Sequence, residues 1–161
     1  MTESKRQDHE IQAIQPFCDV LSRRGLNWNR GQKADNRIIL ERNVSYQFGD
    51  LRFSSGGRHL VVEVESAGGV TNLAKYWYCL REGLITGKLF LFHVFWQETP
   101  DSYRSHMLVW DLLRMEMEKE FPEQFMARRY PYTPMTVARD LVQAVEDFAS
   151  LLPDKKREAL R

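Results

Sequence analysis

Three carboxylates come close together in the segment GDLRFSSGGRHLVVEVES. Side chains alternate along a strand, so Val61, Glu63 and Glu65 are predicted to share one face. A hairpin that turns through SSGG would set Asp50 opposite Val61 and place Asp50 on that same face. Asp50 and Glu63 would then be diagonal neighbours about 7–8 Å apart, a separation that two carboxylates can bridge by sharing one divalent cation.

The chemistry of such a group is that of a hard divalent ion. Neighbouring carboxylates raise each other's pKa, and burial removes their hydration, so a bound Mg²⁺ or Mn²⁺ would offset both costs. A water on that ion is a nucleophile for phosphodiester hydrolysis. In the alternative interpretation, Glu63 and Glu65 line the solvated face of an edge strand, and Arg52 and Arg58 form ordinary ion pairs with them.

The surrounding pattern predicts the elements that would position these acids. Apolar residues at helical spacing indicate helices near 11–21, 73–82, 101–120 and from 134 to 152. Runs rich in β-branched and aromatic residues predict strands at RIILER, SYQFGDLRF, HLVVEVES and KLFLFHVFW. The second helix would bury Leu73, Trp77 and Leu80. The order predicts an α/β fold, with a mixed β-sheet of about four or more strands flanked by helices.

Length and composition are typical of one folded domain. The chain has 161 residues, of which 43% are hydrophobic, and a formal net charge of +1, which mildly disfavours a dedicated nucleic-acid binder. We expect a core at 8–97, a C-terminal helical extension at 101–152 and a polar tail at 153–161. The N-terminus lacks the apolar run of a secretory signal, and the longest apolar run is too short to span a bilayer, so a cytoplasmic protein is expected.

The cysteines and histidines predict no further site. Cys18 and Cys79 lack metal-binding spacing and are expected to be buried free thiols. His93, in the middle of a predicted central strand, is expected to be a hydrogen-bonded core residue rather than a catalyst. Nucleotide-binding glycine loops and serine hydrolase motifs are absent from the sequence.

Asp50, followed by Glu63-Val64-Glu65 on the next strand and then by a helix and a strand, resembles the PD-(D/E)XK nuclease superfamily. The resemblance implies a restriction-endonuclease-like αβββαβ core over about the first hundred residues. It also implies Mg²⁺ or Mn²⁺ held by Asp50, Glu63 and the Val64 carbonyl. The chain departs from the motif in having Gly49 where proline is usual and Glu65 where lysine is usual. Glu65 would then act as a general base or a further ligand.

The same resemblance suggests functions for the helix that begins at TNLAKYW. Lys75 would supply the catalytic positive charge, as helix lysines do in some families of this fold. Asn72 would hold water or phosphate at the helix N-terminus, where backbone N–H groups favour anions. A third acid would come from Glu10 or, as a rival, Glu41. The alternative for Lys75 is a plain surface lysine.

Basic residues suggest where nucleic acid would bind. Arg30 and Lys33 lie in the first polar loop, and Arg128 and Arg129 alternate with tyrosines in MARRYPY. Such a mixture suits phosphate contact and base stacking. A solvated loop with inward-packed tyrosines is the alternative.

The sequence therefore supports two functional hypotheses. A third and weaker one is that the protein is a small-molecule-binding α/β domain. The first is a metal-dependent nuclease that hydrolyses nucleic acid, with DNA favoured over RNA. The second is a catalytically inactive nuclease-fold protein that serves in binding or assembly. A homodimer, built through a strand edge or the C-terminal helices, is compatible with both.

Overall fold

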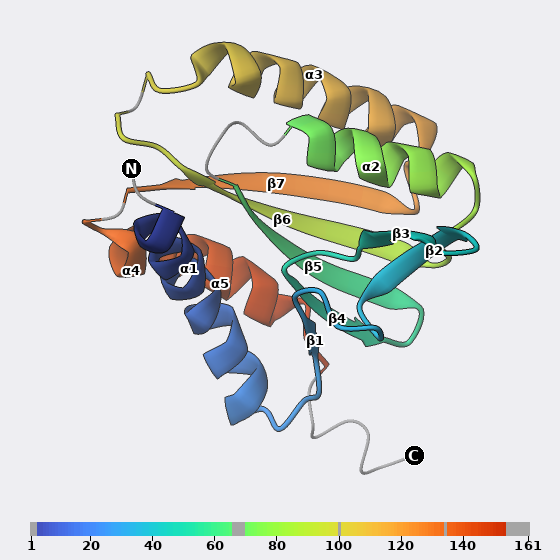
Figure 1. Cartoon of the computed structure of the whole chain (residues 1–161), viewed down its shortest axis with the longest axis horizontal. Helices are drawn as coiled ribbons and strands as arrows, with labels where there is room; N and C mark the ends of the chain where they lie inside the picture. Colours follow the sequence, from blue (N-terminus) through green and yellow to red (C-terminus); the bar gives the residue numbers. More distant parts are fainter. Residues whose placement is uncertain (1–2, 66–69, 100, 134, 154–161) are drawn as a thin grey trace.

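One β-sheet separates two helical layers in the computed structural model, which describes residues 3–65, 70–99, 101–133 and 135–153, with side chains from residue 9 onward. Helices α2 and α3 cover one face of the sheet, and α1, α4 and α5 cover the other (Figure 1). The elements, in chain order, are α1 (Glu3–Arg23), β1 (Asn29–Arg30), β2 (Arg37–Glu41), β3 (Val44–Gln47), β4 (Leu51–Ser55), β5 (Arg58–Glu65), α2 (Val70–Arg81), β6 (Lys88–Trp96), α3 (Arg104–Glu120), β7 (Phe125–Tyr132), α4 (Val137–Asp140) and α5 (Val142–Ser150).

The sheet has five strands in the order β1-β4-β5-β6-β7. Strand β4 runs antiparallel to β1 and β5, whereas β5, β6 and β7 are parallel. A separate hairpin consists of β2 and β3. The predicted α/β fold with a mixed sheet flanked by helices is therefore confirmed.

Strand β5 shows the alternation on which the site depends. Leu60, Val62 and Val64 pack in the core beneath α1, α4 and α5, whereas Val61 packs in the core beneath α2 and α3. Glu63 shares the parity of Val61, and only 3% of its surface is exposed. Because β5 is an interior strand of the sheet, the interpretation of Glu63 as part of a solvated edge-strand face is wrong.

The β4–β5 register differs from the predicted one by two residues. Ser55 pairs with Arg58 across a two-residue turn, and Leu51 pairs with Val62. Asp50 precedes β4 and donates its backbone N–H to the Val62 carbonyl at 2.9 Å, so the predicted pairing of Asp50 with Val61 is wrong. The pairing ends at Leu51, so the register does not set the face of Asp50, and its place is defined by its own hydrogen bonds to Val62 and Val64.

Two predicted strands are organised differently. SYQFGDLRF is divided into β3 and β4 by a bend at 48–50, and RIILER pairs with β3 outside the main sheet. Phe48 anchors this hairpin to the face covered by α2, because its ring lies 6.3 Å from that of Tyr76. The short strand β1, which the sequence suggested as loop, pairs with the outer edge of β4.

The C-terminal part contains a strand that the sequence did not predict. MARRYPY belongs to β7, where Phe125, Ala127, Tyr130 and Tyr132 are buried. The expected last helix is divided into α4 and α5 at Leu141. Residues 66–69, which follow the predicted strand HLVVEVES, and most of the polar tail, 154–161, lie outside the described residues.

Cys18 and Cys79 are buried free thiols, as predicted. Within the described ranges, no helix is both long and apolar enough to cross a membrane.

Candidate functional site

A glycine turn places Asp50 at the start of β4. Gly49 has φ of +81°, and a Cβ there would overlap the Val61 side chain and crowd the Leu51 carbonyl. Proline fixes φ near −65°, so this backbone cannot hold the proline that is usual at the position. The buried Asn36 secures the turn, because its Nδ2 donates to the carbonyl oxygens of Gly31 and Gly49, both at 2.9 Å. Asp50 is thus presented by a rigid turn.

The carboxylate of Asp50 is tied to the neighbouring strand. Its Oδ2 accepts a 2.8 Å hydrogen bond from the backbone N–H of Val64, and its Oδ1 accepts a 2.9 Å bond from Gln47 Nε2. Burial raises the pKa of Asp50, and these two hydrogen bonds oppose that rise. The N–H and C=O of one strand residue point to the same side, so the Val64 carbonyl faces this acid as well.

Glu63 is the most deeply buried acid of the group. Its Oε1 accepts a hydrogen bond from Lys75 Nζ at 2.6 Å and a short one from the Tyr76 hydroxyl. Burial raises the pKa of Glu63 to about 7; Lys75 opposes this rise, and Asp50 adds to it through its own charge. Lys75 also donates to the Gln47 carbonyl at 3.2 Å. Its side chain is only 12% exposed, so the interpretation of Lys75 as a plain surface lysine does not describe its position.

Glu65 lies at the end of β5 with its side chain 19% exposed. Asn72 Nδ2 donates to Glu65 Oε2 at 2.6 Å, and His93 Nε2 lies 3.9 Å from the same oxygen. Helix α2 begins at Val70, so Asn72 is inside its first turn. Its amide donates to an acid, and its suggested role in holding phosphate stays a prediction.

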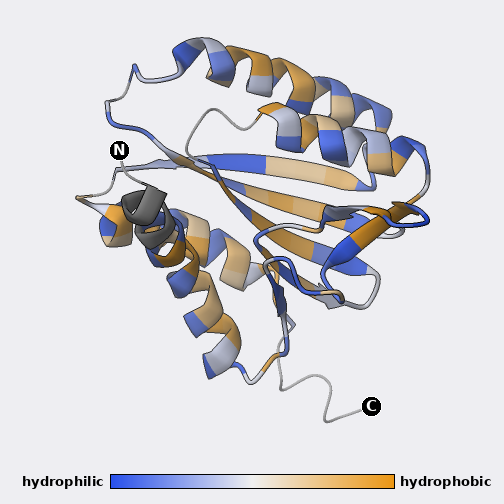
Figure 2. Ribbon diagram, in the orientation of Figure 1, coloured by the Kyte–Doolittle hydropathy of each residue, from blue (hydrophilic) through white to orange (hydrophobic). Residues whose placement is uncertain are grey.

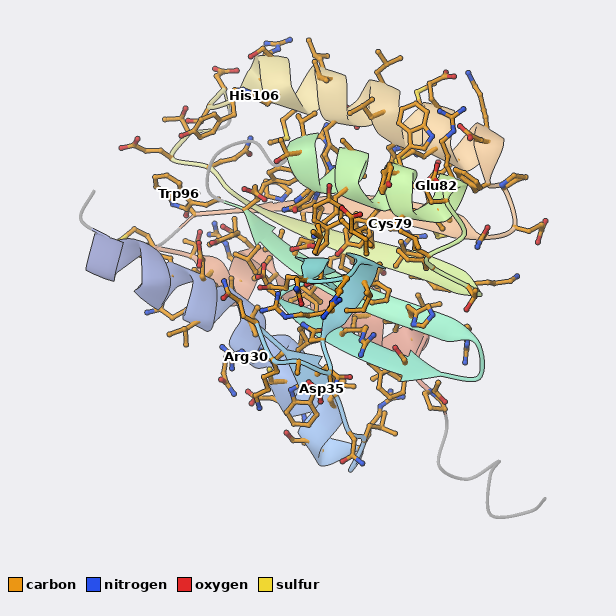
Figure 3. All side chains as sticks on the ribbon, turned by 45° about the vertical axis from the view of Figure 1, so that its right-hand side comes forward. Arg30, Asp35, Cys79, Glu82, Trp96 and His106 are labelled. Carbon is orange, nitrogen blue, oxygen red and sulfur yellow. The ribbon has the colours of Figure 1, made fainter. Side chains whose placement is uncertain are left out.

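A shallow groove of about 200 Å³ opens beside Asp50. Its other walls are Glu10, Ile11 and Ile14 of α1, together with Arg30 and Gly31. Glu10, one of the two suggested third acids, therefore lines the same groove as Asp50. The rival, Glu41, is exposed in the separate β2–β3 hairpin. Figure 3 shows Arg30 and Asp35 near α1, apart from Cys79 of α2 and from Glu82 just past the end of that helix.

The oxygen atoms of this site suit a hard cation, although few of them are available as ligands. Asp50, Glu63 and the Val64 carbonyl offer only oxygen ligands, which Mg²⁺ and Mn²⁺ prefer. Burial raises the pKa of both acids, and a bound cation would favour their charged forms. Lys75 and Tyr76 both contact Oε1 of Glu63, so Oε2 is the oxygen that can face an ion. Across the part of the chain that the structure describes, no three His, Cys, Asp or Glu side chains are already grouped as metal ligands. A site here therefore needs water or substrate ligands.

The suggested nucleic-acid contacts do not form one group. Lys33 is exposed in the loop that follows Arg30. Arg128 and Arg129 lie on β7, on opposite faces of the sheet: Arg128 pairs with Asp147 at 2.9 Å, and Arg129 binds Asp111 through two hydrogen bonds. Strand β6 separates β7 from the strand that carries Glu63. Of these four basic residues, Arg30 is the one that lines the groove beside Asp50.

Several residues that shape the site have no clear signal in the sequence. Tyr76 donates a hydrogen bond to Glu63. In the sequence, only its position next to Lys75 in TNLAKYW indicates that it could lie near the acids. It is fully buried together with Leu73 and Cys79, so the core face of α2 centres on Tyr76 rather than on the predicted Trp77. Gln47 and Asn36 act through hydrogen bonds that bring distant segments together. Such bonds cannot be predicted from the local sequence pattern.

No family model, curated protein or solved structure matches this chain.

Proposed function

We propose that this protein is a metal-dependent, nuclease-like phosphodiesterase that acts on nucleic acid, with DNA as the favoured substrate. The observation that carries the proposal is a pair of buried acids on adjacent segments: Asp50 Oδ2 accepts from the N–H of Val64, the residue after Glu63, at 2.8 Å, and Lys75 contacts Glu63 at 2.6 Å. The element order and the resemblance of this segment to the PD-(D/E)XK superfamily support the same function. Asp50, Glu63 and the Val64 carbonyl would hold Mg²⁺ or Mn²⁺, which supplies Lewis acidity when bound.

The chain's own residues have separate functions in this proposal. Glu65 accepts a proton from the attacking water, whose oxygen forms the new bond to phosphorus while the bond to the leaving oxygen breaks. The leaving oxygen takes the electron pair of that bond and a proton from solvent. Lys75 opposes the negative charge that develops on the phosphoryl oxygens. Arg30 and Lys33 bind backbone phosphates at the groove.

A plasmid-cleavage assay with Mg²⁺ and with Mn²⁺ tests this function. Wild type is expected to nick or linearise the plasmid, and Asp50→Asn and Glu63→Gln are expected to lose that activity. Glu82→Gln is a matched control, because Glu82 is an exposed acid just past the end of α2. Equal cleavage by all four proteins would place the activity elsewhere, and no cleavage with either ion would refute the proposal.

A second candidate function, assembly through the nuclease-like fold without catalysis, is favoured by the outer face of α3. Leu108, Leu112 and Met115 follow one another at helical spacing and are 66%, 58% and 47% exposed. Figure 2 shows apolar positions along α3, which is the outermost of the described elements on its side of the sheet. In this alternative a second copy of the chain would cover the apolar face, in an antiparallel pair of α3 helices centred on Leu112.

Light scattering after size exclusion tests the assembly. Wild type is expected to have twice the chain mass and Leu112→Lys the mass of one chain. Val142→Lys is the control, because Val142 is 50% exposed on the opposite helical layer. A monomeric wild type would rule out this pairing, and a dimer that cleaves no plasmid would favour assembly over catalysis.

A further inference from the structure

His93 occupies the centre of the sheet, directly beside the acids. In the parallel β5–β6 register it is the neighbour of Glu63, and its side chain is fully buried. Its Nδ1 lies 2.8 Å from Trp110 Nε1 of α3. Among the residues that the structure describes, His93 Nε2 has no partner within hydrogen-bond distance, and Glu65 Oε2 lies 3.9 Å away.

The contact with tryptophan fixes the tautomer. The indole N–H can only donate, so Nδ1 of His93 must be the acceptor and carry no proton. The neutral ring then has its proton on Nε2, directed toward Glu65. Burial also lowers the pKa of His93, which keeps the ring neutral. A buried N–H without an acceptor costs free energy, so the Nε2–H of His93 is expected to have an acceptor nearby.

We propose that His93 is a positioning residue for Glu65, and that its Nε2–H donates a hydrogen bond to Glu65 Oε2, directly or through one water molecule. Asn72 donates to that same oxygen, so two donors would hold one oxygen of the carboxylate. Oε1 is then the oxygen directed to accept a proton from the attacking water. Trp110 acts one step further out by setting the histidine tautomer. This assignment rests on the proposed function for the role of Glu65, but the Trp110–His93–Glu65 chain of contacts does not.

Nitrogen NMR of the histidine ring tests the chain of contacts without any activity. In wild type we expect an unprotonated Nδ1 and a protonated Nε2, and Trp110→Phe should release this preference. Glu65→Gln should move the Nε2–H resonance, whereas Glu82→Gln should leave it in place. A protonated Nδ1, or an Nε2–H resonance that Glu65→Gln does not move, would overturn the proposal.

Cleavage kinetics test the consequence for function. His93→Phe removes the donor and should lower kcat by about 10- to 100-fold with KM unchanged, as loss of an orienting partner does. His93→Gln keeps an amide donor and should restore most of that loss. Equal kcat in His93→Phe and wild type would refute the positioning role. If wild type cleaves nothing, the nuclease proposal fails while the NMR result still decides whether His93 contacts Glu65.

Discussion

Lys75 Nζ lies 2.6 Å from Glu63 Oε1, so a helix lysine supplies the positive charge nearest to the most buried acid of the sheet. The same ammonium group donates to the Gln47 carbonyl at 3.2 Å and lies 4.5 Å from the centre of the Tyr76 ring. Lys75 therefore connects α2 to both β3 and β5. The site depends on a balance between this cation, two acids that resist ionisation and, in our proposal, a divalent ion.

Glu63→Gln should stabilise the protein at alkaline pH. The pKa of Glu63 is about 7 in the folded chain, against 4.5 for an exposed glutamate, so folding favours its protonated form. The stability that this group contributes is fully present below about pH 4.5 and is lost as pH rises through 7. Relative to wild type, Glu63→Gln should therefore gain about 1–3 kcal/mol between pH 5 and pH 8. Urea unfolding at both pH values measures this, and a wild type that becomes more stable relative to the variant over that range would contradict it.

Lys75→Met should have the opposite effect on the same acid. It removes the cation and leaves the buried carboxylate of Glu63 uncompensated, at a cost of about 2–3 kcal/mol near pH 8. In the Glu63→Gln background the same substitution should cost less, because no buried charge remains. A double-mutant cycle in urea gives the coupling. Additive effects of the two substitutions would show that the 2.6 Å contact contributes nothing.

Gly49→Ala should displace Asp50. The positive φ and the overlap with Val61 together should cost about 2–4 kcal/mol. Gly56→Ala is the matched control, because Gly56 has φ of +57° but open space around its Cβ position. Thermal unfolding compares them, and equal losses would mean that only backbone conformation matters at Gly49.

Arg30 should contribute to nucleic-acid affinity where Arg128 does not. Loss of one phosphate contact in Arg30→Gln should weaken DNA binding and reduce the slope of log affinity against log salt by about 1. Arg128→Gln should leave both unchanged, because Arg128 is paired with Asp147 at the far side of the sheet. Fluorescence anisotropy in EDTA over a salt series distinguishes them. An equal effect of the two substitutions would argue against binding at the groove.

The sequence predicted the parts of the fold that depend on local periodicity. The alternation in VVEVE placed Glu63 and Glu65 correctly on the face of Val61, because alternation along one strand does not depend on its register with the next strand. The turn itself was misjudged, since SSGG allows either a four-residue or a two-residue loop. Tyr130 and Tyr132 of β7 alternate as buried residues of a strand do. The two arginines before them made the segment look like a polar loop.

The rest of the site depends on contacts between distant segments. Asn36 reaches Gly49, Trp110 reaches His93 and Lys75 reaches Gln47, and none of these pairs has a local signature. His93 was correctly interpreted as a hydrogen-bonded core residue, but its unpartnered nitrogen becomes visible only in three dimensions. Arg128 and Arg129 look alike in sequence, yet strand alternation directs them to opposite faces.

Calorimetric titration with Mn²⁺ tests the central claim, that Asp50 and Glu63 form one divalent-ion site. Wild type and Glu82→Gln should bind one ion per chain with the same affinity, whereas Asp50→Asn and Glu63→Gln should each lose that binding while remaining folded. Binding of the ion by all four proteins alike, or by none of them, would contradict the claim.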